Sequence, residues 1–314
     1  GYDKVLADLS DLYEQVPEGY DEEKTVKELM DPYYLDCMTY YEDDKQYFVP
    51  WAIAFGGLVY NKKLFDKYSI ELPRTTEELF DIMDRMKVIE NNNYAKTEKN
   101  KNNVYPFIIS GDAGYTEMLS LVWWMQYEGI STFYNFMEGK TNSGIYSPQI
   151  YLQNPDAIGY DFKTSQVKFL GGEAFMMCNG DWLDKEADKH YKPGEIDVRY
   201  MKPPVISSII ENLPKDSIED EDDLRAVIDY IDGNRSTKPI GIEDEDVEYV
   251  RTARNMAYCG GGTHSALIPS YSNNIEGAKD FLLFMLSKQG MEIMMQQTAG
   301  NTFPFPVRSE EHTS

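Results

Sequence analysis

The sequence is poor in the residues that build disulfide frameworks and metal sites. Its 314 residues include three cysteines and three histidines, without a CxxC pair or metal-ligand spacing. They are Cys37, Cys178, Cys259, His190, His264 and His312. An odd number of scattered cysteines argues against a disulfide framework, and we expect no metal and no cofactor. Cys178 stands in an apolar run, which predicts a buried thiol.

Positive charge is also scarce. There are 30 Lys and Arg residues against 54 Asp and Glu residues, a formal net charge of −24. A surface this acidic repels phosphate backbones, so nucleic acid is excluded as a partner. The acidity itself is most simply explained by solubility.

No apolar run is long enough to span a bilayer, and the chain has neither an initiator methionine nor a signal peptide. Because it opens at Gly1, we expect a fragment or a processed form. Residues 308–314 read RSEEHTS, which resembles a sequencing adapter translated in frame. We therefore expect a non-native tail at 308–314, with the natural chain continuing beyond Val307.

The motifs of common catalytic sites are absent as well. The sequence contains no GxSxG, no HExxH, no Walker loop, and no GxGxxG after a strand. Paired carboxylates of the glycosidase kind are defined by spacing in three dimensions, so 54 acidic residues carry no signal for them. No catalytic residue is predicted.

The elements that are present alternate between strand and helix. Tyr47–Asn61 is a long β-rich run interrupted by Gly56-Gly57, which predicts a bend or a close backbone approach. Residues 73–87 predict a helix, with Thr75 as N-cap and Glu78 completing a capping box. A short strand at 105–110 is followed by a glycine loop and by a helix that Gly129 ends. This alternation predicts an α/β protein.

An acidic region at about 216–255 predicts two short helices around Asp232-Gly233-Asn234. Acidic residues crowd the first turn of the first helix, where the helix dipole stabilises them. A calcium loop is the alternative explanation for the acids. The spacing and the glycine that an EF-hand needs are missing, so we favour the helix explanation.

Aromatic residues near turns are the remaining candidates for a site. The run AFMMC at 174–178 predicts a buried strand, which Asn179-Gly180 closes as a turn, and Trp182 follows. Ligand sites in open α/β sheets lie just beyond strand ends, so Trp182 is the strongest candidate. Trp51 and Tyr115 are weaker ones. One of Trp123 and Trp124 is expected to face the core, because they are adjacent on a helix.

Three segments resemble the extracellular solute-binding proteins of family 1, the carbohydrate receptors of bacterial ABC importers, to which maltose-binding protein is distantly similar. They are FVPWAIAFGGLVYNKKLFDKYSIELPRTTEEL, FLGGEAFMMCNGDWL and THSALIPSYSNNIEGAKDFLLFMLSKQGMEIMMQQTAGNTFPF. The resemblance runs from about Tyr2 to Val307. It implies that the chain is truncated at both ends, without the family's signal peptide and lipobox cysteine.

The resemblance implies a two-lobed α/β fold of the periplasmic-binding-protein type II, with hinge strands between the lobes. Lobe one would be residues 1–53 and 264–305, incomplete at its N-terminus. Lobe two would be residues 54–263, including the helical pair at about 216–255. The crossings would be Trp51–Leu58 and Gly262–Ile268, whose glycines would flex as the lobes close.

The family also implies a ligand cleft in which aromatic side chains stack on sugar rings and polar groups bind the hydroxyls. Carried over residue by residue, the resemblance implies a ligand-binding set. Its members are Trp182, Asp181, Asn179, Trp51, Tyr47, Asp112, Tyr115 and His264. Ala54 stands where the maltose receptor has a ligand-contacting acid, so the identity of the sugar is not carried over.

The implied function is binding of an oligosaccharide outside the cell and its delivery to the membrane permease of an ABC importer. The protein would be a monomer without catalytic activity, extracellular or periplasmic and anchored by a lipid. Two alternatives stay open: a glycoside-active enzyme that uses the same aromatic cleft, and a receptor for another small solute.

Overall fold

The computed structural model describes residues 2–40, 42–91, 104–111, 115, 117–137, 159–187, 190–192 and 194–298, to which the structural statements below refer. The predicted tail at 308–314 lies outside these residues. The helices are η1 (Tyr2–Lys4), α1 (Ser10–Tyr13), α2 (Val26–Leu29), α3 (Pro32–Met38), α4 (Lys62–Lys67), α5 (Thr76–Asn91), α6 (Glu117–Glu128), α7 (Ile130–Met137), α8 (Phe162–Leu170), α9 (Leu183–Ala187), η3 (Ser207–Asn212), α10 (Glu221–Ile231), α11 (Asp244–Asn255), α12 (Ile275–Met285) and α13 (Lys288–Thr298). The strands are β1 (Thr39–Tyr40), β2 (Lys45–Gln46), β3 (Val49–Asn61), β4 (Tyr105–Ile108), β5 (Ala174–Gly180), β6 (Val198–Met201) and β7 (Tyr258–Ala266).

Contacts within the chain divide it into two compact units. Unit 1 comprises Gly1–Phe55, Gly180–Glu186 and Cys259–Ser314, and unit 2 comprises Gly56–Asn179 and Ala187–Tyr258. Each unit is therefore built from segments that are far apart in the sequence. The predicted lobes have slightly different bounds, residues 1–53 and 264–305 for lobe one and residues 54–263 for lobe two. That the two units are these lobes stays a prediction.

Unit 1 joins the first residues of the chain to α12 and α13. Leu6 forms an antiparallel bridge with Pro269. The ammonium of Lys279 on α12 lies 2.7 Å from a carboxylate oxygen of Asp11 on α1. The apolar core of unit 1 consists of Ala7, Leu9, Leu12, Tyr13, Val26, Met30, Met38, Val49, Ile268, Leu282, Leu286 and Met291.

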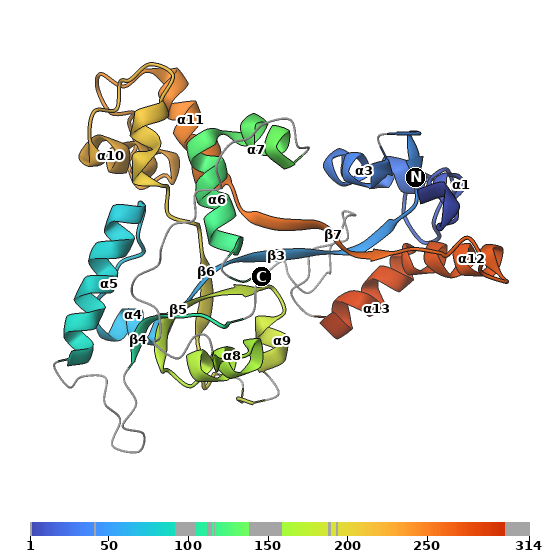
Figure 1. The fold of residues 1–314 in the computed structure, drawn as a ribbon, viewed down its shortest axis with the longest axis horizontal. Helices are drawn as coiled ribbons and strands as arrows, with labels where there is room; N and C mark the ends of the chain where they lie inside the picture. Colours follow the sequence, from blue (N-terminus) through green and yellow to red (C-terminus); the bar gives the residue numbers. More distant parts are fainter. Residues whose placement is uncertain are drawn as a thin grey trace. The chain divides into compact units, whose positions relative to one another are not determined.

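The sheet has five strands in the order β4-β5-β3-β6, with β7 pairing with β3 (Figure 1). β4 and β5 are parallel, with Tyr105 opposite Ala174, whereas β3 and β6 are antiparallel, with Leu58 opposite Met201. α5 packs beside β4 in unit 2. A mixed sheet with helices against it is the predicted α/β class.

β3 runs without interruption through Gly56-Gly57, where a bend or a close backbone approach was predicted. A Cβ atom at Gly56 would lie 2.5 Å from the Sδ atom of Met118 on α6, whereas one at Gly57 would meet no atom within 4 Å. The close approach that a strand glycine indicates is thus found at Gly56. The glycine lets the Met118 side chain pack directly on the strand backbone.

The predicted N-cap of α5 is confirmed, and the second half of its capping box is displaced by one residue. The Glu78 N–H donates to the Thr75 hydroxyl at 3.3 Å. The Glu78 carboxylate accepts from the Arg74 backbone N–H at 2.8 Å instead of from Thr75. The Arg74 guanidinium also bonds this carboxylate and so draws it toward Arg74.

The predicted helical pair is present as α10 and α11, which lie side by side in unit 2 (Figure 1). Asp220 caps α10, since its carboxylate accepts from the Asp223 N–H at 3.0 Å. Three acidic residues occupy the first turn of each helix. The pair and η3 enclose a core of their own, formed by Val205, Ile209, Leu213, Ile218, Leu224, Val227, Ile228, Ile242, Val247, Val250 and Ala253.

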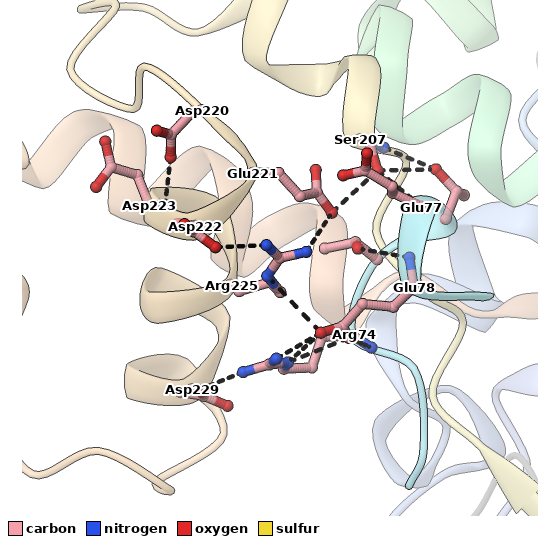
Figure 2. Close-up of polar contacts among 12 residues, drawn as sticks. Arg74, Glu77, Glu78, Ser207, Asp220, Glu221, Asp222, Asp223, Arg225 and Asp229 are labelled. Atoms are coloured by element: carbon pink, nitrogen blue, oxygen red, sulfur yellow. Dashed lines mark hydrogen bonds and ion pairs between the residues drawn. The ribbon is translucent and has the colours of Figure 1, made fainter. Parts of the chain in front are cut away.

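Charged side chains connect α10 to the start of α5 (Figure 2). The Arg74 guanidinium lies between Glu78 and Asp229, 2.6 Å from an Asp229 carboxylate oxygen. The Arg225 guanidinium lies 3.8 Å from the Glu78 carboxylate. Burial raises the pKa of Glu78, but the hydrogen bonds from Arg74 outweigh it and the net shift is downward. The acids of α10 therefore serve as ion-pair partners within unit 2.

The expected burial of Cys178 is confirmed, and both adjacent tryptophans are buried. Cys178 is 3% exposed, and burial raises the pKa of its thiol to about 12. The Trp123 indole N–H donates to the Pro204 carbonyl at 2.9 Å. Trp124 packs edge-on against Phe133 of α7, with ring centroids 5.2 Å apart. Neighbouring residues therefore cover α6 on two faces, whereas the sequence predicted that only one of the two tryptophans faces the core.

Candidate functional site

The turn that presents Trp182 begins later than predicted. β5 continues through Asn179 and Gly180, and the turn consists of Asp181 and Trp182 before α9 begins. An Asn-Gly hairpin turn requires positive φ angles, and neither residue has one. The Asp181 N–H instead donates to the Phe55 carbonyl at 2.9 Å. The predicted turn at Asn179-Gly180 is therefore wrong, but the position of Trp182 just beyond the strand is correct.

Trp182, Trp51 and His264 come together in unit 1 from three segments distant in sequence. His264 of β7 contacts both indoles. Its ring centroid lies 5.4 Å from that of Trp51 on β3 and 5.8 Å from that of Trp182, nearly perpendicular to the latter. The Trp182 indole N–H donates to the His264 Nε2 atom at 3.4 Å. All three side chains are half-buried, so the aromatic cluster is neither core nor fully solvated surface.

Asp181 adds a carboxylate beside this cluster. Both of its carboxylate oxygens are buried and have no hydrogen-bond partner among the described residues. Burial raises the pKa of this carboxyl. The nearby backbone N–H groups of Phe55 and Asp181 and the charge of His264 act in the opposite direction but do not cancel it. An unsatisfied buried carboxylate is costly, and it is a group to which a ligand can donate hydrogen bonds.

Tyr47 in unit 1 and Asn179 in unit 2 make contacts of their own. Asn179 is buried within β5, where its amide nitrogen lies 3.6 Å from the Met177 sulfur. Tyr47 is 1% exposed, and its hydroxyl donates to the Asp43 carboxylate at 2.7 Å. This hydrogen bond raises the Tyr47 pKa to about 12. The Tyr47 ring packs against Tyr2 and Tyr40.

The remaining predicted residues belong to unit 2. Tyr115 stacks on Phe162, with centroids 4.8 Å apart and planes 13° from parallel. Asp112 lies outside the described residues. Sequence reasoning missed Phe162, although Asp161, the N-cap of α8, is a signal for a helix start at this position.

Neither a metal-binding group nor a membrane-spanning helix is found among the described residues. No group of three or more His, Cys, Asp or Glu side chains within these ranges is placed to hold a metal ion. Among the helices that the structure describes, none has both the length and the apolar character needed to cross a membrane.

Comparison with solved structures identifies the fold. A chitin oligosaccharide binding protein superposes with a TM-score of 0.63 at 16% identity, covering 97% of this chain and 63% of its own. RafE in complex with raffinose gives 0.60 at 16% identity, covering 98% and 65%. Maltose-bound MalE3 of T. maritima gives 0.55 at 15% identity, covering 97% and 63%. The fold is the two-lobed α/β fold of solute-binding proteins, as predicted.

The chain spans less than two thirds of the length of these structures. No curated protein matches the sequence. The family model described as bacterial extracellular solute-binding protein matches residues 3–292, which is most of the chain. The predicted family resemblance is thereby confirmed. The chain belongs to the bacterial extracellular solute-binding protein family.

Proposed function

We propose that this protein is the carbohydrate receptor of an ABC-type importer, and that it binds an oligosaccharide at Trp51, Trp182 and Asp181. The observation that carries the proposal is the half-buried aromatic cluster beside an unsatisfied carboxylate. Family membership and sugar-binding structural neighbours support it.

The chemistry of the cluster matches that of a pyranose. A sugar ring has an apolar face of C–H groups, for which indoles supply flat apolar surface. Its rim carries hydroxyls, which can donate to the Asp181 carboxylate. Binding would then satisfy two oxygens that have no hydrogen-bond partner in the described part of the chain.

The energetics require more than one stacking residue. Stacking that removes on the order of 100 Å² of apolar surface from water contributes roughly 2–3 kcal/mol. Micromolar binding needs about 8 kcal/mol. We therefore include both indoles and the Asp181 carboxylate in the site. Tyr115, Asn179, Tyr47 and Asp112 remain proposed contributors.

The protein in this proposal performs no reaction: it binds sugar, closes, and docks on membrane permease subunits. We further propose that it acts as a monomer outside the cytoplasm, held at the membrane by a lipid anchor. An enzyme would differ in one measurable way. Incubation with raffinose would generate new reducing ends, whereas a receptor shows saturable binding without product.

The test is calorimetry with maltose, raffinose and triacetylchitotriose, followed by replacement of the central indole. Trp182→Ala should weaken the affinity for the sugar that binds by at least about tenfold, equivalent to about 1.4 kcal/mol of binding free energy. The variant should lose little stability, because the side chain is only half-buried.

Tyr271→Ala is the matched control, since Tyr271 is an 83% exposed aromatic of the same unit outside the cluster. It should bind sugar as the wild type does. If Trp182→Ala unfolds or binds with unchanged affinity, the indole is not the sugar platform. If none of these sugars, nor a wider glycan panel, binds the wild type, the proposed function is wrong.

A further inference from the structure

The hydrogen bond between the Trp182 indole and His264 depends on where the imidazole carries its proton. An indole N–H can donate a hydrogen bond and cannot accept one. The contact of 3.4 Å between Trp182 Nε1 and His264 Nε2 therefore requires a lone pair on Nε2. The proton of the neutral imidazole must then be on Nδ1. A doubly protonated imidazole would place an N–H on Nε2, facing the N–H of the indole.

The backbone of Trp182 is held by hydrogen bonds on both sides of the turn. The Asp181 N–H donates to the Phe55 carbonyl, and the Glu186 N–H donates to the Trp182 carbonyl at 3.0 Å. These bonds fix the backbone and do not involve the indole. Within the described ranges, His264 is the only hydrogen-bond partner of the indole N–H. The orientation of the platform thus depends on the imidazole.

We propose that His264 is a positioning residue whose neutral form holds the Trp182 indole in place, so that protonation of the imidazole releases the indole and weakens sugar binding. The effect on affinity rests on the proposed function, whereas the effect on the indole does not. His264 in this scheme acts through Trp182 and makes no hydrogen bond to the sugar.

Among the described residues, Asp181 is a second titratable group that interacts with His264. β3 contributes Trp51, which has no titratable group. The turn after β5 contributes Asp181, which interacts electrostatically with the imidazole. Acidification therefore acts on two groups of the site, the carboxyl and the imidazole. Asp181→Asn separates them, because an amide does not titrate.

The indole can be followed directly without any sugar. The protein is labelled with ¹⁵N-tryptophan, and the indole N–H signals are recorded from about pH 8 to about pH 5, the range in which histidines ordinarily gain a proton. The Trp182 signal, assigned with Trp182→Phe, should shift during this titration in the wild type and in Asp181→Asn. The Trp123 signal is an internal control, since its N–H donates to the Pro204 carbonyl and should not move.

His264→Gln is the decisive variant. The glutamine carbonyl can accept from the indole but does not titrate, so the Trp182 signal should stay constant with pH when His264→Gln is combined with Asp181→Asn. If the signal titrates in this double variant as it does in Asp181→Asn alone, or does not titrate in Asp181→Asn, the proposal is wrong.

Affinity provides the second arm. The affinity is measured for the sugar that binds at about pH 8, chosen from maltose, raffinose and triacetylchitotriose. The wild type should bind this sugar about fivefold or more weakly at about pH 5 than at about pH 8. With Asp181→Asn present to remove the titrating carboxyl, adding His264→Gln should make the affinity the same at both pH values, and adding His264→Ala should make it weaker at both. A loss at acid pH that persists when Asp181→Asn and His264→Gln are combined contradicts the proposal. Absence of binding at every pH contradicts the proposed function, while the indole titration still decides the role of His264.

Discussion

The carboxyl group of Asp181 is the most unusual side chain of the candidate site. Its oxygens are buried and have no hydrogen-bond partner in the described part of the chain, and burial raises its pKa. Most buried polar groups in proteins are satisfied, because an unsatisfied one weakens folding. Binding residues are a recurrent exception, since the ligand supplies the missing bonds. We therefore expect Asp181 to lower stability and to increase affinity.

Asp181→Asn should make the ligand-free protein more stable at neutral pH. A carboxyl whose pKa is raised by folding loses stability as the pH increases from the unfolded value, about 3.9, through the folded one. The amide has no charge to bury, so the advantage of the variant should shrink below about pH 4. Urea unfolding of both proteins between pH 3 and pH 8 measures this difference.

Sugar affinity should change in the opposite direction to stability in Asp181→Asn. The ionised carboxylate is the stronger acceptor for sugar hydroxyls, so the variant should bind more weakly. A variant that is less stable at neutral pH and binds sugar normally would show that Asp181 has a structural role.

At the scale of elements, the two glycines of β3 have different roles. A Cβ atom at Gly56 would collide with Met118 of α6, and one at Gly57 would meet open space. Both glycines look the same in the sequence, where each simply lowers the tendency to form a strand. The contact with α6 distinguishes them, because Met118 is 62 positions away along the chain.

Gly56→Ala should lower the free energy of unfolding by about 1–3 kcal/mol, the usual cost of an overpacked methyl group. Met118 is flexible, which favours the lower end of this range. Gly57→Ala is the matched control and should be neutral, or stabilising by up to about 1 kcal/mol through reduced backbone entropy. Equal effects of the two substitutions in urea unfolding would contradict the packing argument.

At the scale of the whole molecule, the net charge of −24 dominates. Some acidic residues have partners, such as Asp229 with Arg74 and Asp232 with Arg254. With 54 acidic and 30 basic residues, many carboxylates have no basic residue to pair with. A compact chain with such an excess repels itself, and salt screens this repulsion.

Raising sodium chloride from about 20 mM to about 300 mM should therefore increase the thermal midpoint, because the Debye length falls below about 10 Å. Screening of about 1 kcal/mol corresponds to roughly 1–2 °C for a chain of 314 residues. Differential scanning calorimetry measures the shift. A midpoint that falls with salt would mean that attractive ion pairs outweigh the repulsion.

Local patterns in the sequence determined the elements. Thr75 predicted a helix start because capping depends on residues within one turn of the chain, and its hydroxyl does accept from the Glu78 N–H at 3.3 Å. The apolar run 174–178 predicted β5 and the burial of Cys178, because such a run is also a local feature of the chain. The family resemblance determined the fold class.

Tertiary structure decided which candidate residues share a site. Tyr47 and Trp51 are close neighbours in sequence, yet Tyr47 is buried among tyrosines and Trp51 meets His264. No local pattern carries that difference, because His264 and Trp182 reach Trp51 from segments more than 100 residues away. The extension of β5 through Asn179-Gly180 was also invisible in the sequence. It depends on the hydrogen bond between Asp181 and Phe55, which exists only once distant strands have paired.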